Sequence, residues 1–398
     1  MASGAAGPKK VTPAVPVARG PLDPAVQRGL EWLVKAQHPD GGWGAGSHAN
    51  QQMRDPRQVV TDPATTAFVA MALVRTGSTP ESGPHREALQ RATLYLVQAV
   101  ESAPAQGPRI TQIEGTQPQA KLGALVDTGM ASQYLARILP TLTPGSPLHK
   151  RVDAALDRCV HKLEESQQAD GTWNGAGGWA PVLQSSLSTS ALEMAQAAGK
   201  RVDGTKLDRA RQYQKGNFDA ASGRAEAGAA AGVELYAFSS AQRAGALEAV
   251  DAVAQLDAAK EKGVLPSSAP VSEENLKKAG VEPAKARSLS QAYQAQNAQL
   301  RRLADDQLLS GFGSNGGEEY LSYLQTSESL VIAGNGGWEA WKQKMSARLA
   351  KIQSQDGSWT GHHCITSPVF CTAAVLQCLT ADRDAVSLRR LVQVGRKG

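Results

Sequence analysis

The sequence predicts an all-α protein in which inner and outer helices alternate around a closed ring, an α/α toroid. Two observations predict this fold. One plan, an amphipathic helix that ends in Gln and is followed by Asp-Gly-x-Trp, occurs three times, at residues 28–43, 163–173 and 349–359. A helix rich in small residues follows each copy. Because one such unit cannot bury its apolar face alone, the units are expected to pack against one another.

Each copy is predicted to be a helix, a tight corner and the start of a second helix. In the first copy Asp23 supplies an N-cap and Pro24 occupies the first helical position. After the helix, Asp-Gly turns the chain, because Gly accepts a positive φ and Asp bonds its own backbone. We expect Trp43 to cover the end of the helix and Gln37 to hydrogen-bond backbone groups left free there.

The helices that follow the corners begin with polar residues and are otherwise rich in Ala, Thr and Ser. They lie within residues 61–73, 185–192 and 366–376. Such a helix can be surrounded closely by other helices, whereas the helix before each corner has one polar face. The pattern therefore predicts inner helices enclosed by outer ones.

Four segments are predicted along the chain. Residues 1–20 form a disordered N-terminal arm, and residues 21–217 and 311–398 form the two parts of the toroid. Residues 218–310 do not fit the repeat, because they are rich in Ala, Gln and charged residues and have few large apolar ones. We expect this segment to be a helical insertion with a mobile stretch near 262–285, where prolines interrupt the pattern.

The composition excludes several classes of protein. The 42 Lys and Arg residues exceed the 37 Asp and Glu residues by five, and these charges are spread along the chain. Without a basic stripe, nucleic acid is not an expected partner. No stretch approaches the roughly 18 apolar residues of a membrane helix, and the start lacks the compact apolar run of a secretory signal. We expect a cytoplasmic protein with no transmembrane segment and, with four cysteines, no disulfide framework.

Residues 28–43 resemble the QW motif of the terpene cyclase/prenyltransferase superfamily, with Arg-Gly, an aromatic-aliphatic pair, Gln and Gly-x-Trp at the family spacing. Residues 163–173 and 349–359 resemble the second half of that motif. The resemblance covers most of residues 21–210 and 310–395. It implies an α/α barrel whose central funnel binds a hydrophobic or isoprenoid-like ligand.

The sequence departs from the squalene-hopene-type cyclases that it resembles in its corners. Those enzymes protonate a double bond with an Asp-x-Asp-Asp motif, which occurs nowhere in the 398 residues. They also line their cavity with aromatic rings that stabilise cations. This chain has seven Trp, seven Tyr and five Phe, and three of the Trp belong to corners. A squalene-hopene-type polycyclase is therefore not expected.

Two His and two Cys lie close together at the entry to an inner helix: His362, His363, Cys364 and Cys371. These are ligand types that zinc accepts. Protein prenyltransferase β-subunits, which share the barrel, hold zinc with Asp, Cys and His, so the resemblance implies zinc as the candidate cofactor and these four residues as its ligands. Two alternatives stay open. Cys371 and Cys378 are core residues on one helical face, or Cys364 is a nucleophile with a neighbouring His as its base.

Acidic residues at the starts of inner helices are expected to face the mouth of the funnel: Asp62, Asp127, Glu318 and Glu319. An acidic side chain in a first turn also stabilises the helix dipole, and Asp62 before a Pro is most simply an N-cap. Glu318 and Glu319 are expected to face His362 and Cys364, either as metal ligands or as acid–base partners. Asp127 lies among apolar residues, where an unpaired charge would be costly, so it is expected to be functional or paired.

Two functions from different classes follow. The first is a toroid that binds a hydrophobic or isoprenoid-like small molecule in its funnel, with zinc-assisted transferase or lyase chemistry. The candidate catalytic residues are Cys364, His362, His363, Glu318, Glu319 and Asp127. The second is a non-catalytic scaffold that binds a peptide or protein partner through the insertion. The fold alone does not decide between them.

Overall fold

The computed structural model describes residues 20–313, 315–334 and 336–395. The predicted N-terminal arm, residues 1–20, lies outside the described residues except for Gly20. The α-helices of the described part are α1 (Pro24–Lys35), α2 (Pro63–Arg75), α3 (Arg86–Ser102), α4 (Gln117–Leu122), α5 (Val126–Ile138), α6 (Pro147–Ser166), α7 (Pro181–Ala197), α8 (Gly204–Gly216), α9 (Glu234–Glu261), α10 (Glu273–Lys278), α11 (Pro283–Arg302), α12 (Asp306–Leu309), α13 (Gly317–Ala333), α14 (Gly337–Ala350), α15 (Pro368–Leu379) and α16 (Ala385–Gly395).

The remaining regular structure consists of short elements. Strand β1 (Phe218–Asp219) pairs antiparallel with β2 (Arg224–Ala225), with Phe218 opposite Ala225. Short 3₁₀ helices lie at His48–Asn50, Pro56–Gln58, Leu139–Thr141, Asn174–Ala176, Gly228–Ala230 and Ala381–Asp384. No helix among the described residues is long and apolar enough to cross a membrane.

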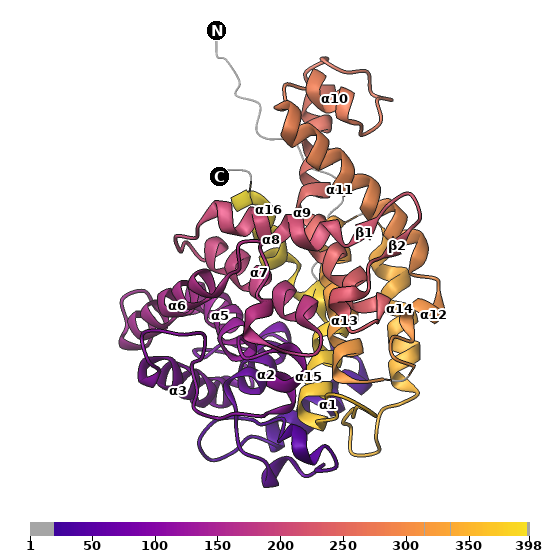
Figure 1. Cartoon of the computed structure of the whole chain (residues 1–398). Coiled ribbons are helices and arrows are strands. Elements are labelled where there is room, and N and C mark those ends of the chain that lie inside the picture. The colour runs from indigo at the N-terminus through magenta and orange to yellow at the C-terminus, as the bar shows by residue number, and fades with distance from the viewer. Residues whose placement is uncertain (1–19, 314, 335, 396–398) are drawn as a thin grey trace.

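Helices α2, α5, α7, α9, α13 and α15 form an inner ring. Each packs against the next in chain order, and α15 packs back against α2, so the ring is closed. Helices α1, α3, α6, α8, α11 and α14 cover this ring from outside. Figure 1 shows the closure, because α1 and α15 lie side by side although they come from opposite ends of the chain. The predicted α/α toroid is confirmed.

Burial separates the two layers. Every residue of α2 and every residue of α15 is buried, and both helices are rich in Ala, Thr and Val. The outer helix α6, in contrast, buries one face only, through residues such as Val152, Leu156 and Leu163. Small side chains let the inner helices be enclosed on all sides, whereas the outer helices need a polar face toward water.

The three predicted corners share two contacts. The Trp indole N–H donates to a carbonyl of the preceding helix at 2.8, 2.8 and 2.9 Å: Trp43 to Leu33, Trp173 to Leu163 and Trp359 to Leu349. The Gln side chain donates both to its own corner and to the next outer helix: Gln37 to Gly41 and Ala88, Gln167 to Gly171 and Lys206, and Gln353 to Gly357 and Ala25. The contact with Ala25 joins the last corner to α1 and helps to close the ring.

The structure places part of the 218–310 segment inside the toroid. The first half of α9, through Leu247, belongs to the main hydrophobic core and packs against α7 and α13. The second half of α9, with α10 and the first half of α11, projects from the ring and has small cores of its own, around Leu276 and Leu265 (Figure 1). The sequence pattern assigned the first half of α9 to the insertion, because its many small residues indicated a segment with little hydrophobic core. Small residues are, however, what a helix enclosed by other helices needs.

Candidate functional site

The inner helices begin at the same end of the ring, which we call the mouth. Polar side chains there cap the start of neighbouring helices. Asp127 accepts a hydrogen bond from the N–H of Ala64 at 3.0 Å, and Gln117 accepts from the N–H of Thr366 at 2.7 Å. The first turn of α13 reaches the segment before α15 in the same way, and the first turn of α9 reaches α13. The mouth therefore gathers residues from all parts of the chain.

Glu319 fastens the glycine-rich segment before α13. One carboxylate oxygen accepts from the hydroxyl of Tyr236 at 2.7 Å and from the N–H of Phe312 at 3.0 Å. The other accepts from the N–H of Gly316 at 2.9 Å, which makes Glu319 part of the helix cap. These three hydrogen bonds let Glu319 hold the segment before α13 against α9.

Glu318, its neighbour, is bonded through one oxygen only. Oε2 accepts from the N–H of Ile365 at 3.2 Å, whereas Oε1 is buried and has no hydrogen-bond partner among the described residues. Burial, followed by the charge of Glu319, raises the pKa of Glu318 to about 8. The side chain is therefore mainly a neutral carboxylic acid at pH 7, and such an acid can donate a proton.

Cys364 and His363 lie beside the two glutamates. Cys364 is 8% exposed, has a φ of 58° and lies beside Glu318. Burial and Glu318 raise the pKa of its thiol to about 12, so the thiolate needed by a nucleophile is scarce at neutral pH. The Nε2 atom of His363 lies 3.8 Å from Oε2 of Glu319. The geometry thus assembles Glu318, Glu319, His363 and Cys364, but it disfavours Cys364 as the nucleophile.

Partly exposed aromatic side chains lie next to this buried group. Trp179 and Phe312 are 43% and 53% exposed, and their ring centroids are 5.8 Å apart. Phe312 also contacts the ring of His363 at 5.2 Å, and the Nζ atom of Lys121 lies 4.6 Å from the centroid of Trp179. We call these four residues, together with Tyr236, Glu318, Glu319 and Cys364, the mouth site.

Three other predicted residues lie outside this arrangement. Asp127 is paired rather than free, because it also accepts from Gln119 at 2.7 Å and lies beside Asp62. Burial raises the pKa of both Asp62 and Asp127, and both cap the start of α2. His362 is exposed. Cys371 is fully buried in α15, with its Sγ atom 3.5 Å from the carbonyl of Ile365.

The residues present do not fit the expected zinc centre. His362 is exposed, whereas the thiol of Cys371 is fully buried with its pKa raised well above the usual value. Among the described residues, no three His, Cys, Asp or Glu side chains are arranged to hold a metal ion.

Sequence reasoning missed half of the mouth site. Lys121, Trp179 and Tyr236 join it from α4, from the loop before α7 and from α9. Trp179 and Phe312 stood in glycine-rich segments, Gly177-Gly178-Trp179 and Gly311-Phe312-Gly313, and an aromatic residue between glycines was the available signal. Tyr236 carried no such signal, because its segment was assigned to the insertion.

Comparison with known proteins supports the resemblance seen in the corners. The family model described as the squalene-hopene cyclase C-terminal domain matches residues 12–107, a range that includes the first corner. The resemblance to the terpene cyclase superfamily is confirmed there. No curated protein matches the chain.

Solved structures of the type II terpene cyclase MstE from Scytonema have a similar arrangement of helices. A variant of MstE bound to its product, merosterolic acid A, matches with a TM-score of 0.45 at 15% identity, covering 91% of this chain and 96% of that one. A second variant, bound to its substrate geranylgeranyl dihydroxybenzoate, matches with a TM-score of 0.42 at 14% identity, covering 91% and 97%. At these values the likeness carries no inference about activity.

Proposed function

We propose that the mouth site binds a hydrophobic, isoprenoid-like ligand and that Glu318 acts on it as a general acid. The observation that carries this proposal is a buried carboxyl group with a raised pKa and an unbonded Oε1 atom, next to exposed aromatic rings. A carboxyl group that stays protonated at neutral pH can donate its proton to an oxygen atom of a bound ligand, and the apolar rings beside it can hold the hydrocarbon part of that ligand.

Each part of the mouth site has a distinct task in this proposal. The rings of Trp179 and Phe312 offer apolar surface to the ligand. Glu318 transfers the proton on Oε1 to the hydroxyl oxygen of the ligand, so that the C–O bond breaks and water leaves. The carboxylate that remains is stabilised by the N–H of Ile365 and by the nearby charge of Lys121, and it takes a proton back when the cation forms its product. Glu319 and Tyr236 hold the segment that carries Phe312. Because Glu318 is fully buried, the mouth must open for the ligand to reach it.

Binding and turnover can be measured separately with farnesol as the probe. Trp179 is an exposed indole in contact with the site, so its fluorescence should change as farnesol is added. Removing the ring in Phe312→Ala should weaken binding about tenfold, the size expected for one well-packed aromatic contact. Val264→Ala removes an exposed apolar side chain from the projecting arm and should leave binding unchanged.

Glu318→Gln tests the acid. This variant should bind farnesol normally and lose conversion to cyclic or isomerised products, monitored by gas chromatography. Equal binding by the wild type and Phe312→Ala would show that the ligand site is wrong. Normal binding with product formation retained in Glu318→Gln would show that the acid is wrong.

A non-catalytic scaffold is the second candidate, and one observation favours it. Cavities of about 230 to 670 Å³ lie between other elements of the described part, and no residue of the mouth site lines them. A scaffold predicts that farnesol neither binds nor reacts and that Glu318→Gln changes stability alone. The same two measurements therefore separate the two functions.

A further inference from the structure

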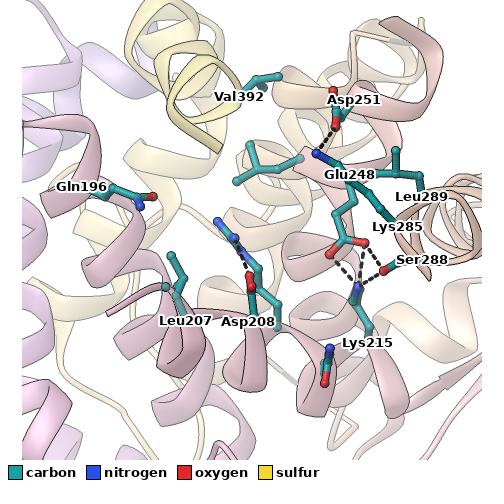
Figure 2. Close-up of a pocket in the computed structure, with 14 residues that line it drawn as sticks. Gln196, Leu207, Asp208, Lys215, Glu248, Asp251, Lys285, Ser288, Leu289 and Val392 are labelled. Atoms are coloured by element: carbon teal, nitrogen blue, oxygen red, sulfur yellow. Dashed lines mark hydrogen bonds and ion pairs between the residues drawn. The ribbon is translucent and has the colours of Figure 1, made fainter. Parts of the chain in front are cut away.

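A cleft runs between α8 and α11, far along the chain from most of the mouth-site residues. Two cavities of about 390 and 670 Å³ lie along it, and both are lined by Gln212, Lys215 and Ser288. Since they share these three residues, the two cavities adjoin. Figure 2 shows the smaller one, with Gln196 and Leu207 on one side and Lys285 and Leu289 facing them.

The cleft exists because α8 and α11 both pack on α9. The floor, on α9, includes Ala241 and Gly245, whose small size leaves depth between the walls. One polar link crosses the cleft: the Nζ atom of Lys215 contacts the Glu248 carboxylate at 2.6 and 2.7 Å and Ser288 at 3.1 Å (Figure 2). This link holds the two walls at a fixed distance.

Glutamine side chains with unused amide groups line the walls. Those of Gln196, Gln212, Gln291 and Gln294 make no hydrogen bond to other described residues. The larger cavity is also lined by Gln299, which is 1% exposed and whose amide nitrogen and oxygen both have no partner among the described residues. A buried amide without partners is costly, so its presence calls for a ligand or water to bond it.

The corner glutamines differ from those of the cleft. Gln37, Gln167 and Gln353 each use their amide nitrogen twice within the protein. Those side chains stabilise the fold, whereas the amide groups of the cleft glutamines are available to hydrogen-bond a ligand.

We propose that this cleft binds an extended peptide segment through its backbone. A carboxamide presents one acceptor and two donors, which match the alternating C=O and N–H groups of a peptide. The wall formed by α11 from Lys285 to Gln299 is about 21 Å long at 1.5 Å per residue. At about 3.3 Å per residue, this length accommodates roughly six extended residues.

The smaller cavity adds one preference for a side chain. Leu207, Leu247, Leu289 and Val392 line it, so an apolar side chain of the peptide can enter there. The cations of this cavity already face carboxylates, with Lys215 on Glu248 and Arg211 on Glu193. A strongly charged ligand therefore gains little, and the peptide that fits is neutral, with an apolar residue near one end.

The test starts from random-sequence heptapeptides displayed on phage and selected on the immobilised full chain. Selected peptides are then synthesised with a fluorophore, and their affinity is measured by anisotropy. Gln291→Ala combined with Gln294→Ala removes two exposed amides and should weaken binding about tenfold, as expected for two lost hydrogen bonds. The matched control is Gln52→Ala, which removes an exposed amide outside the cleft and should have no effect.

A ligand-side control isolates the backbone contacts. N-methylation of the central peptide bonds removes donors and keeps the side chains, so it should also abolish binding to the wild type. The proposal fails if no peptide binds below millimolar concentration. It fails equally if the selected peptides bind the double variant and the wild type alike. Farnesol binding at the mouth is measured separately, so neither result depends on the proposed acid site.

Discussion

Helix α13 carries Glu318 at the mouth and Glu328, whose side chain is 13% exposed, toward the other end of the toroid, and the environments of these two glutamates are opposite. Glu318 lies at the mouth with no salt bridge among the described residues, and burial raises its pKa to about 8. Glu328 lies ten residues further along. Burial acts on it in the same direction, but Arg75 and Arg243 together hold its pKa below the usual range. Burial alone therefore does not determine the charge of a side chain here, because the presence of a cation reverses its effect.

The far end of the ring is held by a network of such pairs. Arg243 bridges Glu193 at 2.9 Å and Glu328 at 3.2 Å, and Arg75 also contacts Glu328. Asp384, after α15, pairs with Arg137 from the end of α5 at 2.6 Å. The network joins inner helices from across the ring, so we interpret this end as structural. The mouth keeps an uncompensated acid, which is the better place for chemistry.

The largest expected effect comes from breaking the network. Arg243→Met leaves Glu193 and Glu328 buried with one cation fewer, which should lower the free energy of unfolding by about 3–5 kcal/mol. Urea denaturation at pH 7, followed by circular dichroism, measures this. Arg287→Met, which removes a cation that is 64% exposed, should change it by less than about 1 kcal/mol. Similar losses in both variants would contradict a structural role for the far end.

The two glutamates should respond to pH in opposite directions. A carboxyl whose folded pKa is raised loses stability as pH rises, so Glu318 should weaken the fold between its usual pKa of 4.5 and about 8. Glu318→Gln cannot ionise, and it should gain about 1–3 kcal/mol relative to the wild type across this window.

Glu328 has a lowered pKa, so its contribution is present above the usual value and is lost as pH falls through the folded one. Glu328→Gln should therefore be destabilised at pH 7, and its difference from the wild type should shrink in acid. Urea unfolding of both variants from pH 4 to pH 9 provides the comparison. Parallel profiles for the two variants would mean that the two ends do not differ.

The sequence predicted the fold well because the corners are local. Helix, Gln, turn and Trp lie within about a dozen residues of one another, and the three copies form the same contacts. The place of helix α9 in the ring was harder to predict. Small residues on all sides make it an inner helix, but the same composition is also typical of a segment without a hydrophobic core. Only the contacts with α7 and α13 distinguish the two.

The mouth site was predictable only where its residues are close in sequence. Glu318 and Glu319 at a helix start lie beside His363 and Cys364, which share one loop. His362, next to them, is exposed, and that difference depends on backbone geometry that composition does not encode. Lys121 and Tyr236 reach the site only because the ring closes, so no short-range pattern could place them there.

A smaller effect is expected from loosening the glycine-rich segment. Tyr236→Phe removes the hydroxyl that donates to Glu319 and should reduce the free energy of unfolding by about 1–2 kcal/mol. Hydrogen exchange should also become faster at the N–H groups of Phe312 and Gly316, which donate to Glu319. Tyr293→Phe, a hydroxyl removed from the projecting arm, should change neither quantity. If exchange in the segment is unchanged, then the backbone bonds of Glu319 suffice without Tyr236.

The smallest effect concerns the tuning of the acid itself. The charge of Lys121 lowers the pKa of Glu318, against the larger effects of burial and Glu319. Lys121→Met should therefore raise that pKa. Between pH 4.5 and the folded pKa, the wild type loses stability relative to Glu318→Gln, and the upper limit of this window should move to higher pH. Introducing Lys121→Met into the wild type and into Glu318→Gln measures the shift, and Lys277→Met, in the projecting helix α10, is the control. An unchanged limit would leave burial and Glu319 as the whole cause of the raised pKa. Lys121 would then act at the mouth only through its contact with Trp179.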